Sequence, residues 1–149
     1  MWYPFQLIYT KGFFDHIDHE LMMQILHKVT DKRHILLYCE RWLKAPVQTE
    51  DGITRERLEG SPQGGVISPL LSNIFLHEVF DSWMQLYHSH MVFERYADDI
   101  IIHTRSIEQS EFILDKVRER LKQYSLELNE EKTKIVYCFR TARFHVYIN

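Results

Sequence analysis

The stretch that decides the fold runs from residue 93 to residue 103 and reads Phe-Glu-Arg-Tyr-Ala-Asp-Asp-Ile-Ile-Ile-His. Residues 92–97 and 100–103 are rich in β-branched and aromatic side chains, which predicts two strands, and the pair Asp98 and Asp99 between them predicts a tight turn. Asp is common in ordinary solvated turns. Two adjacent carboxylates repel each other, however, and between hydrophobic strands they would be held rigidly enough to bind Mg²⁺. The pair is therefore a candidate metal site.

A second candidate site lies in a loop rich in glycine and proline. Residues 60–69 read Gly-Ser-Pro-Gln-Gly-Gly-Val-Ile-Ser-Pro and hold three of the five glycines and two of the four prolines of the chain. Gly64 and Gly65 would let the backbone approach a ligand closely, and the Gln63 side chain can bond a base or sugar edge. The loop lacks the Lys and Thr of a P-loop, and a helix-entry loop without a ligand is the alternative.

The remaining elements follow from periodicity and from helix-start and turn signals. In chain order we expect a strand at 5–10, a helix from Asp18, a helix at about 31–45, a hairpin at about 47–59, a long helix at 68–87, a helix at 106–124 and a strand at 133–139. The first helix should turn Leu21, Ile25 and Val29 inward, and the second should turn Ile35, Tyr38 or Cys39, Trp42 and Leu43 inward. Ser68 is the expected N-cap of the long helix, and the helix at 106–124 should open with a capping box of Ser106 and Gln109. This order predicts an α+β fold, an antiparallel sheet with helices packed on one face.

Composition bounds the class of protein. The chain has 149 residues, 45% of them hydrophobic and 26% charged, which is enough for one domain with a real core. No apolar run is long enough for a membrane span and the start does not read as a signal peptide, so we expect a cytoplasmic protein with no membrane partner. Cys39 and Cys138 belong to no metal or disulfide pattern. The net charge of −3 does not by itself indicate nucleic-acid binding.

Four blocks of this chain, at 11–19, 61–71, 93–99 and 128–134, resemble in order the motifs of the reverse transcriptase domain of group II intron-encoded proteins, also called intron maturases. They read Lys-Gly-Phe-Phe-Asp-His-Ile-Asp-His, Ser-Pro-Gln-Gly-Gly-Val-Ile-Ser-Pro-Leu-Leu, Phe-Glu-Arg-Tyr-Ala-Asp-Asp and Leu-Asn-Glu-Glu-Lys-Thr-Lys. The resemblance implies a polymerase palm that adds deoxynucleotides to a primer on an RNA template with Mg²⁺.

The resemblance also implies a role for each matching residue. The resemblance makes Asp98 the primary Mg²⁺ ligand and Asp99 a supporting one, and it makes both residues catalytic. It also makes Lys132 catalytic, as the residue that would approach the pyrophosphate. The substrate-binding residues would be Phe14, as the bulky residue that excludes a 2′-hydroxyl, and Gln63, Gly64, Gly65 and Tyr96, which would lie at the bound substrate. For Lys132, a solvated loop cation is the alternative that the residue type alone favours.

One position departs from the family pattern. Family members usually read Asp-Ile-Lys-Gly-Phe-Phe-Asp where this chain has residues 9–15, so Tyr9 stands at the position of a metal-ligating Asp. A neutral phenol does not replace a hard carboxylate for Mg²⁺. Asp15 and Asp18 follow the predicted strand and are not expected to substitute. We therefore expect weakened Mg²⁺ binding and an inactive chain.

The 149 residues are expected to form a single partial reverse transcriptase domain, the palm without fingers, thumb or maturase regions. Implied partners are RNA template, DNA primer and deoxynucleoside triphosphate, with intron RNA as a further one, and uncovered apolar surface would favour a homo-oligomer. The alternatives are a non-catalytic RNA-binding or protein-interaction remnant of the palm, and a nucleotidyl-cyclase-like enzyme, which the Gln63 loop and the order of the blocks disfavour. The histidine pairs at 16 and 19 and at 88 and 90 are interpreted as solvated or hydrogen-bonded rather than as metal ligands.

Overall fold

The structure is a computed structural model that describes residues 2–48, 51–62, 65–139 and 145–147. It divides the chain into two compact units, one made of residues 1–11 and 79–149 and the other of residues 12–78. Within the described residues, no helix is both long enough and apolar enough to cross a membrane.

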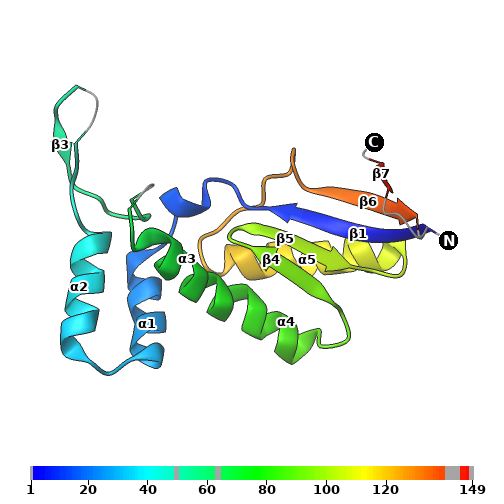
Figure 1. Cartoon of the computed structure of the whole chain (residues 1–149), viewed down its shortest axis with the longest axis horizontal. Helices are drawn as coiled ribbons and strands as arrows, with labels where there is room; N and C mark the ends of the chain where they lie inside the picture. Colours follow the sequence, from blue (N-terminus) through cyan, green and yellow to red (C-terminus); the bar gives the residue numbers. More distant parts are fainter. Residues whose placement is uncertain (1, 49–50, 63–64, 140–144, 148–149) are drawn as a thin grey trace. The chain divides into compact units, whose positions relative to one another are not determined.

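The first unit is built on an antiparallel sheet of five strands (Figure 1). In spatial order these are β4 (Phe93–Tyr96), β5 (Asp99–His103), β1 (Trp2–Tyr9), β6 (Lys134–Phe139) and β7 (His145–Tyr147). The predicted strands at 5–10, 92–97 and 100–103 are therefore neighbours in one sheet. The first of them begins earlier than predicted, because β1 pairs with β6 from Trp2 onward.

Helices cover one face of this sheet. Ile8 lies opposite Ile100 in the β1–β5 register, and both side chains are buried, as is that of Ile102 on the same face. Phe80 packs edge-on against Phe93, which is opposite Ile102. The helix α5 (Ile107–Lys122) contacts β1 and runs behind β4 and β5 in Figure 1. The α+β prediction, with helices packed on one face, is confirmed.

The second unit is mainly helical. It contains a 3-10 turn η1 (Phe13–Asp15), α1 (His19–Val29), α2 (Arg33–Leu43), the two-stranded hairpin β2 (Val47–Gln48) and β3 (Thr54–Arg55), and α3 (Ser68–Leu76). Asp18 caps α1, since its carboxylate accepts the backbone N–H groups of Glu20 and Leu21. Phe13 and Phe75 are buried, with ring centroids 6.4 Å apart. The two predicted helices, from Asp18 and at about 31–45, are present, and so is the predicted hairpin at about 47–59, whose strands are shorter than expected.

Several residues predicted to face inward are exposed instead. Val29, Ile35 and Trp42 are exposed, whereas Leu36 and Cys39 are buried on α2. For Ile35 and Trp42 the reason is the phase of α2, because the stripe at positions 36, 39 and 43 is buried rather than the one through 35 and 42. Val29 is the last residue of α1.

The helix that follows the glycine-rich loop also differs in two respects. Ile67 rather than Ser68 is its N-cap, and the Ser68 hydroxyl instead donates to the Pro62 carbonyl at 2.6 Å. The predicted helix at 68–87 is interrupted after α3 by a π-helical segment at residues 77–81, and α4 (Ser82–Tyr87) then completes it. The sequence carries no proline or glycine there to signal the change.

Replacing Gln6 with Leu is expected to stabilise the chain. The Gln6 side chain is completely buried in β1 opposite Ile102 and Ile135, and neither polar atom of its side-chain amide has a hydrogen-bond partner among the residues that the structure describes. Because an unpaired buried polar group costs roughly 1–3 kcal/mol, Gln6→Leu should raise the free energy of unfolding by about that amount. Urea denaturation followed by circular dichroism measures it, with the exposed Gln24→Leu as a control of no expected gain. An unchanged or lower stability would contradict the expectation.

Candidate active site

The turn between β4 and β5 is held in a strained conformation. Tyr96 pairs with Asp99, so Ala97 and Asp98 are its two central residues, and Asp99 is the first residue of β5 rather than part of the turn. Ala97 has a φ of 53°, in the region that residues other than glycine rarely occupy. Such strain costs about 1–3 kcal/mol and is concentrated at functional sites. This turn is therefore the first element of the candidate site.

Tyr9 lies at the same end of the sheet as the two carboxylates. It is opposite Asp99 in the β1–β5 register, and Asp99 is in turn opposite Tyr96. Residues directly opposite each other point to the same face of a sheet, so these three side chains share the face that the helices leave uncovered. Tyr96 is 85% exposed. Asp98 directly precedes Asp99 in the chain, so the structure assembles Tyr9, Asp98 and Asp99 in one place.

A nearly buried ion pair braces the turn from the helical side. The Arg95 guanidinium donates to both carboxylate oxygens of Asp81, at 2.8 and 2.6 Å, and to the Ala97 carbonyl at 2.8 Å. The Arg95 and Asp81 side chains are only 11% and 14% exposed. Arg95 thus connects the strained turn to the last residue of the π-helical segment. No motif in the sequence predicted a role for Arg95 or Asp81. The available signal for this ion pair was that Arg95, a charged residue, occupies an inward-facing position of β4, two residues after the apolar Phe93.

The block around Lys132 is bound to the end of β1. The Asn129 N–H donates to the Tyr9 carbonyl at 2.8 Å, and the Tyr9 N–H donates to the Thr133 hydroxyl at 3.3 Å. Inside this turn the Lys132 N–H donates to the Asn129 side chain at 3.1 Å, and Lys132 is exposed. The turn that carries Lys132 is therefore fixed beside Tyr9.

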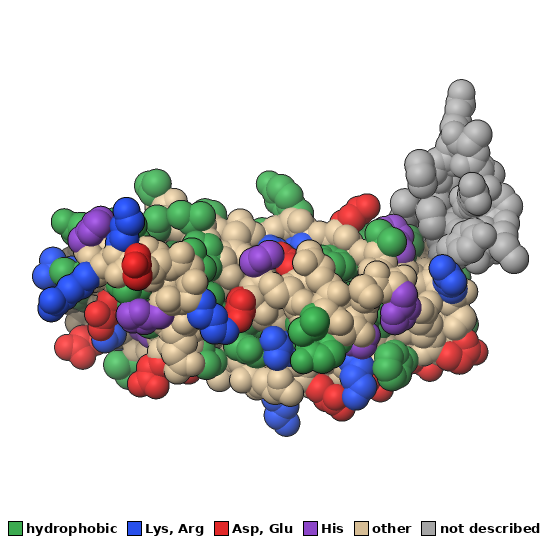
Figure 2. Space-filling model, turned by 90° about the horizontal axis from the view of Figure 1, so that it is seen from below, with side chains coloured by type: hydrophobic (Ala, Val, Ile, Leu, Met, Phe, Trp, Pro, Cys, Tyr) green, Lys and Arg blue, Asp and Glu red, His purple; other side chains and the backbone are tan. Residues whose placement is uncertain are grey.

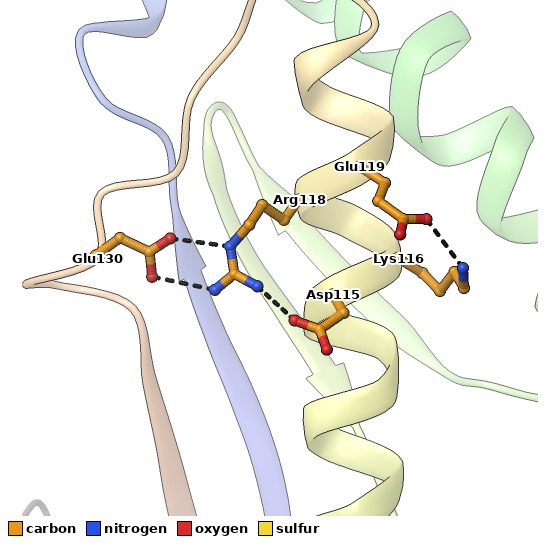
Figure 3. Close-up of polar contacts among 5 residues, drawn as sticks. All are labelled: Asp115, Lys116, Arg118, Glu119 and Glu130. Atoms are coloured by element: carbon orange, nitrogen blue, oxygen red, sulfur yellow. Dashed lines mark hydrogen bonds and ion pairs between the residues drawn. The ribbon is translucent and has the colours of Figure 1, made fainter.

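A surface network ties the same turn to α5 (Figure 3). The Arg118 guanidinium forms two hydrogen bonds to the Glu130 carboxylate, at 3.0 and 3.2 Å, and a third to Asp115. The hydrogen bond from Arg118 holds the pKa of Glu130 below its ordinary value, and the charge of Arg118 adds to the effect. Figure 3 also shows the pair Lys116–Glu119, which joins two residues of α5 only.

Acid or loss of Arg118 is expected to loosen the Lys132 turn. Because the pKa of Glu130 is lowered by folding, the stabilisation is present above the ordinary value of 4.5 and is lost as the pH falls below it. Both groups are exposed, so the effect on unfolding should stay below about 1 kcal/mol. Arg118→Met should speed hydrogen exchange of the Thr133 amide at pH 7 and remove the acid dependence of that exchange protection. Lys116→Met is the matched control and should change neither; equal effects of the two variants would refute the tie.

The second unit holds the other half of the matched motifs. Gly60 has a φ of +81°, and a Cβ there would come within 2.7 Å of the Asp15 carbonyl oxygen, so only glycine fits. Its N–H donates to the Ile17 carbonyl, and the Ser61 N–H donates to the Phe14 carbonyl at 2.6 Å. The glycine-rich loop is thereby fastened to the segment that carries Phe14, which is half-buried.

Histidine and aspartate residues of this segment have structural roles. A ring nitrogen of the buried His19 lies 2.7 Å from the Gly60 carbonyl, which confirms that His19 is a hydrogen-bonded histidine. The Asp18 carboxylate is engaged as the cap of α1, and Asp15 ends η1 rather than β1. Neither carboxylate occupies the register position of Tyr9.

Of the predicted substrate-binding loop, Gln63 and Gly64 lie outside the described residues. Gly65 donates its N–H to the Pro62 carbonyl and accepts the Ser68 N–H. A Cβ at position 65 would lie 2.8 Å from the Ser68 hydroxyl, so this glycine permits the close approach that closes the loop onto the helix start.

The donor set at the turn does not fit a complete two-magnesium site. Mg²⁺ prefers carboxylate oxygens, and the structure offers Asp98 and Asp99 beside a phenol at the third position. Within the described residues, no group of three or more Asp, Glu, His or Cys side chains could hold a metal ion. The expected deficiency at Tyr9 is consistent with this geometry.

The fold and this site define a polymerase palm, and the chain belongs to the family described as reverse transcriptase (RNA-dependent DNA polymerase), whose profile matches residues 5–146. It is 33% identical over 135 residues to the group II intron-encoded protein LtrA of Lactococcus lactis subsp. cremoris, a match that covers 89% of this chain and 21% of that protein. It is also 42% identical over 74 residues to protein YkfC of Escherichia coli (strain K12), covering 49% of this chain and 19% of YkfC.

Solved structures show the same fold. The apo telomerase of Candida tropicalis, truncated from its C-terminal domain, matches with a TM-score of 0.69 at 14% identity, over 95% of this chain and 32% of that chain. The resemblance to group II intron reverse transcriptases is confirmed. The chain spans about a fifth of the length of the group II intron relative it matches.

Proposed function

We propose that this chain is the palm portion of a group II intron-type, RNA-directed DNA polymerase. The observation that carries the proposal is the strained Ala97–Asp98 turn, which sets two carboxylates beside the end of β1 on the face that the helices leave open. That is the position where a palm needs charge to act on a primer end and a triphosphate. The proposal treats residues 1–149 as a single partial domain.

The proposed substrates are an RNA template, a DNA primer and a deoxynucleoside triphosphate. Reverse transcriptases generally use a divalent metal, and we propose that Asp98 and Asp99 bind Mg²⁺ more weakly than a complete ligand set. Lys132 would face the pyrophosphate, Phe14 the sugar, and Tyr96 with the Gln63–Gly65 loop the bound substrate. Intron RNA as a further partner, a homo-oligomer and a cytoplasmic location are also proposed.

A second candidate function is a non-catalytic RNA-binding remnant of the palm, and the observation that favours it is Tyr9. The main chain at Tyr9 is hydrogen-bonded to Asn129 and Thr133, while its side chain supplies no carboxylate. The two candidates differ in whether the fold can still catalyse once position 9 and the remaining parts of the polymerase are supplied.

The proposal is tested by grafting. The 135-residue segment of the Lactococcus lactis protein that matches this chain is replaced by this chain carrying Tyr9→Asp, so that the remainder of that protein surrounds it. The aspartate at position 9 supplies the third carboxylate, and the rest of the Lactococcus lactis protein positions the substrates. We therefore expect Mg²⁺-dependent extension of a DNA primer on an RNA template. The same graft with Asp98→Asn should be inactive.

A folded graft that binds RNA but does not extend the primer, with the parent Lactococcus lactis protein active in the same assay, would refute the polymerase proposal. The remnant interpretation would then stand. Circular dichroism and thermal unfolding of the graft and its Asp98→Asn variant establish that both are folded.

A further inference from the structure

The outward side of α2 carries exposed aromatic and basic residues that the palm function does not use. Leu36, Cys39 and Leu43 form the buried stripe of this helix, and His34, Tyr38 and Arg41 lie on the opposite side at spacings of four and three. Trp42 flanks them. We call His34, Tyr38, Arg41 and Trp42 the α2 outer face.

Two rings on this face are stacked and open to solvent. Tyr38 and Trp42 have ring centroids 6.0 Å apart and an interplanar angle of 29°, and they are 52% and 44% exposed. Aromatic residues normally stabilise a fold by burial, which these rings achieve only in part. Exposed, preorganised rings offer a platform on which a nucleobase can stack.

Positive charge surrounds the rings. Residues 27–48 carry five Lys and Arg side chains and two carboxylates, in a chain whose net charge is −3. Within the described residues, no hydrogen bond or ion pair engages the side chains of Lys32, Arg33 or Arg41, whereas Lys44 is paired with Glu40. Figure 2 shows blue side chains gathered at its left edge, the end at which α2 and the β2–β3 hairpin lie in Figure 1.

From this combination we infer that the α2 outer face binds single-stranded RNA, with bases stacked on Tyr38 and Trp42 and phosphates held by Arg41 and its basic neighbours. A phosphate backbone needs cations along its path, and unpaired bases need exposed rings. Tyr, Trp and Arg also suit a protein–protein interface, but Lys is depleted there, so the lysines at 32 and 44 beside the rings favour a nucleic acid as the occupant. The exposed rings and basic side chains of α2 support binding of a single-stranded nucleic acid without reference to the palm. Only the choice of RNA over DNA rests on the proposed function.

The test is fluorescence anisotropy with a labelled RNA of about 12 nucleotides, within the usual range of single-strand site sizes. Tyr38→Ala and Trp42→Ala should each weaken binding about tenfold, as expected for loss of one stacked base. Arg41→Gln, which leaves the packing untouched, should weaken binding and lower the slope of log affinity against log salt by about 0.7. Trp42→Phe should retain most of the affinity, because a ring is kept.

Matched variants separate this surface from the rest of the protein. Tyr87→Ala removes an exposed ring on α4 and should not change RNA binding. Equal losses with Tyr87→Ala would overturn the proposal, as would unchanged binding in Arg41→Gln and Trp42→Ala together. If those two variants altered only the sedimentation of the chain, the face would be a contact between copies instead. Equal or tighter binding of DNA of the same sequence would overturn the choice of RNA. Failure of the graft to extend a primer would leave these results unaffected, so the two proposals fail separately.

Discussion

Grafts that keep Tyr9 are expected to extend a primer at least about 10³-fold more slowly than grafts carrying Tyr9→Asp. A bound metal contributes several kcal/mol of charge stabilisation in a transition state, and each 1.36 kcal/mol is a factor of about ten in rate. Asp98 and Asp99 alone leave the third ligand position to a phenol. Primer extension at saturating triphosphate, with Mg²⁺ varied, measures both the rate and the metal requirement.

Tyr9→Phe is the matched control, since it removes only the hydroxyl. It should behave like the unaltered residue if the phenol has no role as a ligand. The isolated, unaltered chain should be inactive, and Tyr9→Asp should strengthen its binding of divalent ions, because the change adds a carboxylate beside Asp98 and Asp99. Robust extension by the isolated, unaltered chain would show that another carboxylate fills the ligand position, and loss of that activity in Asp15→Asn would identify it.

The second large effect is expected at the ion pair beneath the turn. Arg95→Met should lower the free energy of unfolding by about 2–4 kcal/mol, since breaking one side of a buried pair costs about 3–5 kcal/mol and this pair retains slight exposure. The variant also loses the hydrogen bond to the Ala97 carbonyl, so the turn should be released together with the pair. Urea denaturation gives the stability, and hydrogen exchange of the Asp98 and Asp99 amides reports on the turn.

Three further variants identify the cause of that loss. Arg95→Lys keeps the charge but cannot form the two parallel bonds to Asp81, so it should recover only part of the stability. Combining Arg95→Met with Asp81→Leu should cost less than the two single changes added together, as expected for directly coupled residues. Breaking the exposed pair on α2 by Lys44→Met should cost less than about 1 kcal/mol. A loss in Arg95→Met no larger than this control would contradict the role of the brace.

Local signals in the sequence predicted most elements and the centre of the site. The Ser106 hydroxyl accepts the Gln109 N–H, and the Gln109 side chain accepts the Arg105 N–H, so the predicted capping signal is present with a small shift. The strand–turn–strand pattern at 93–103 correctly placed Asp98 in a tight turn. These successes share a cause: each depends on residues within about four positions of one another, where backbone geometry is set locally.

Features that depend on long-range contacts could not be predicted from the sequence. The brace joins Asp81 to Arg95 across 14 positions, and no short pattern announces such a pair. The phase of α2 depends on which stripe meets its neighbours, and Trp42 was predicted to face inward because periodicity alone does not say which of two apolar stripes is buried. The hydrogen bonds that Tyr9 accepts from the Asn129 N–H and donates to the Thr133 hydroxyl span more than a hundred positions, so only the folded chain reveals them.

The strand end at Tyr9 is built by its main chain. Its N–H is bonded to Thr133 and its carbonyl to Asn129, and both bonds are available to any residue that can occupy an extended strand. A tyrosine codon becomes an aspartate codon by substitution of its first base alone. Both main-chain bonds therefore accept either residue, although an aspartate at position 9 would repel Asp98 and Asp99 unless a cation is bound among them. A gene encoding this chain would therefore stand one point mutation from an aspartate at position 9, and that mutation would leave the main-chain bonds of the strand end in place.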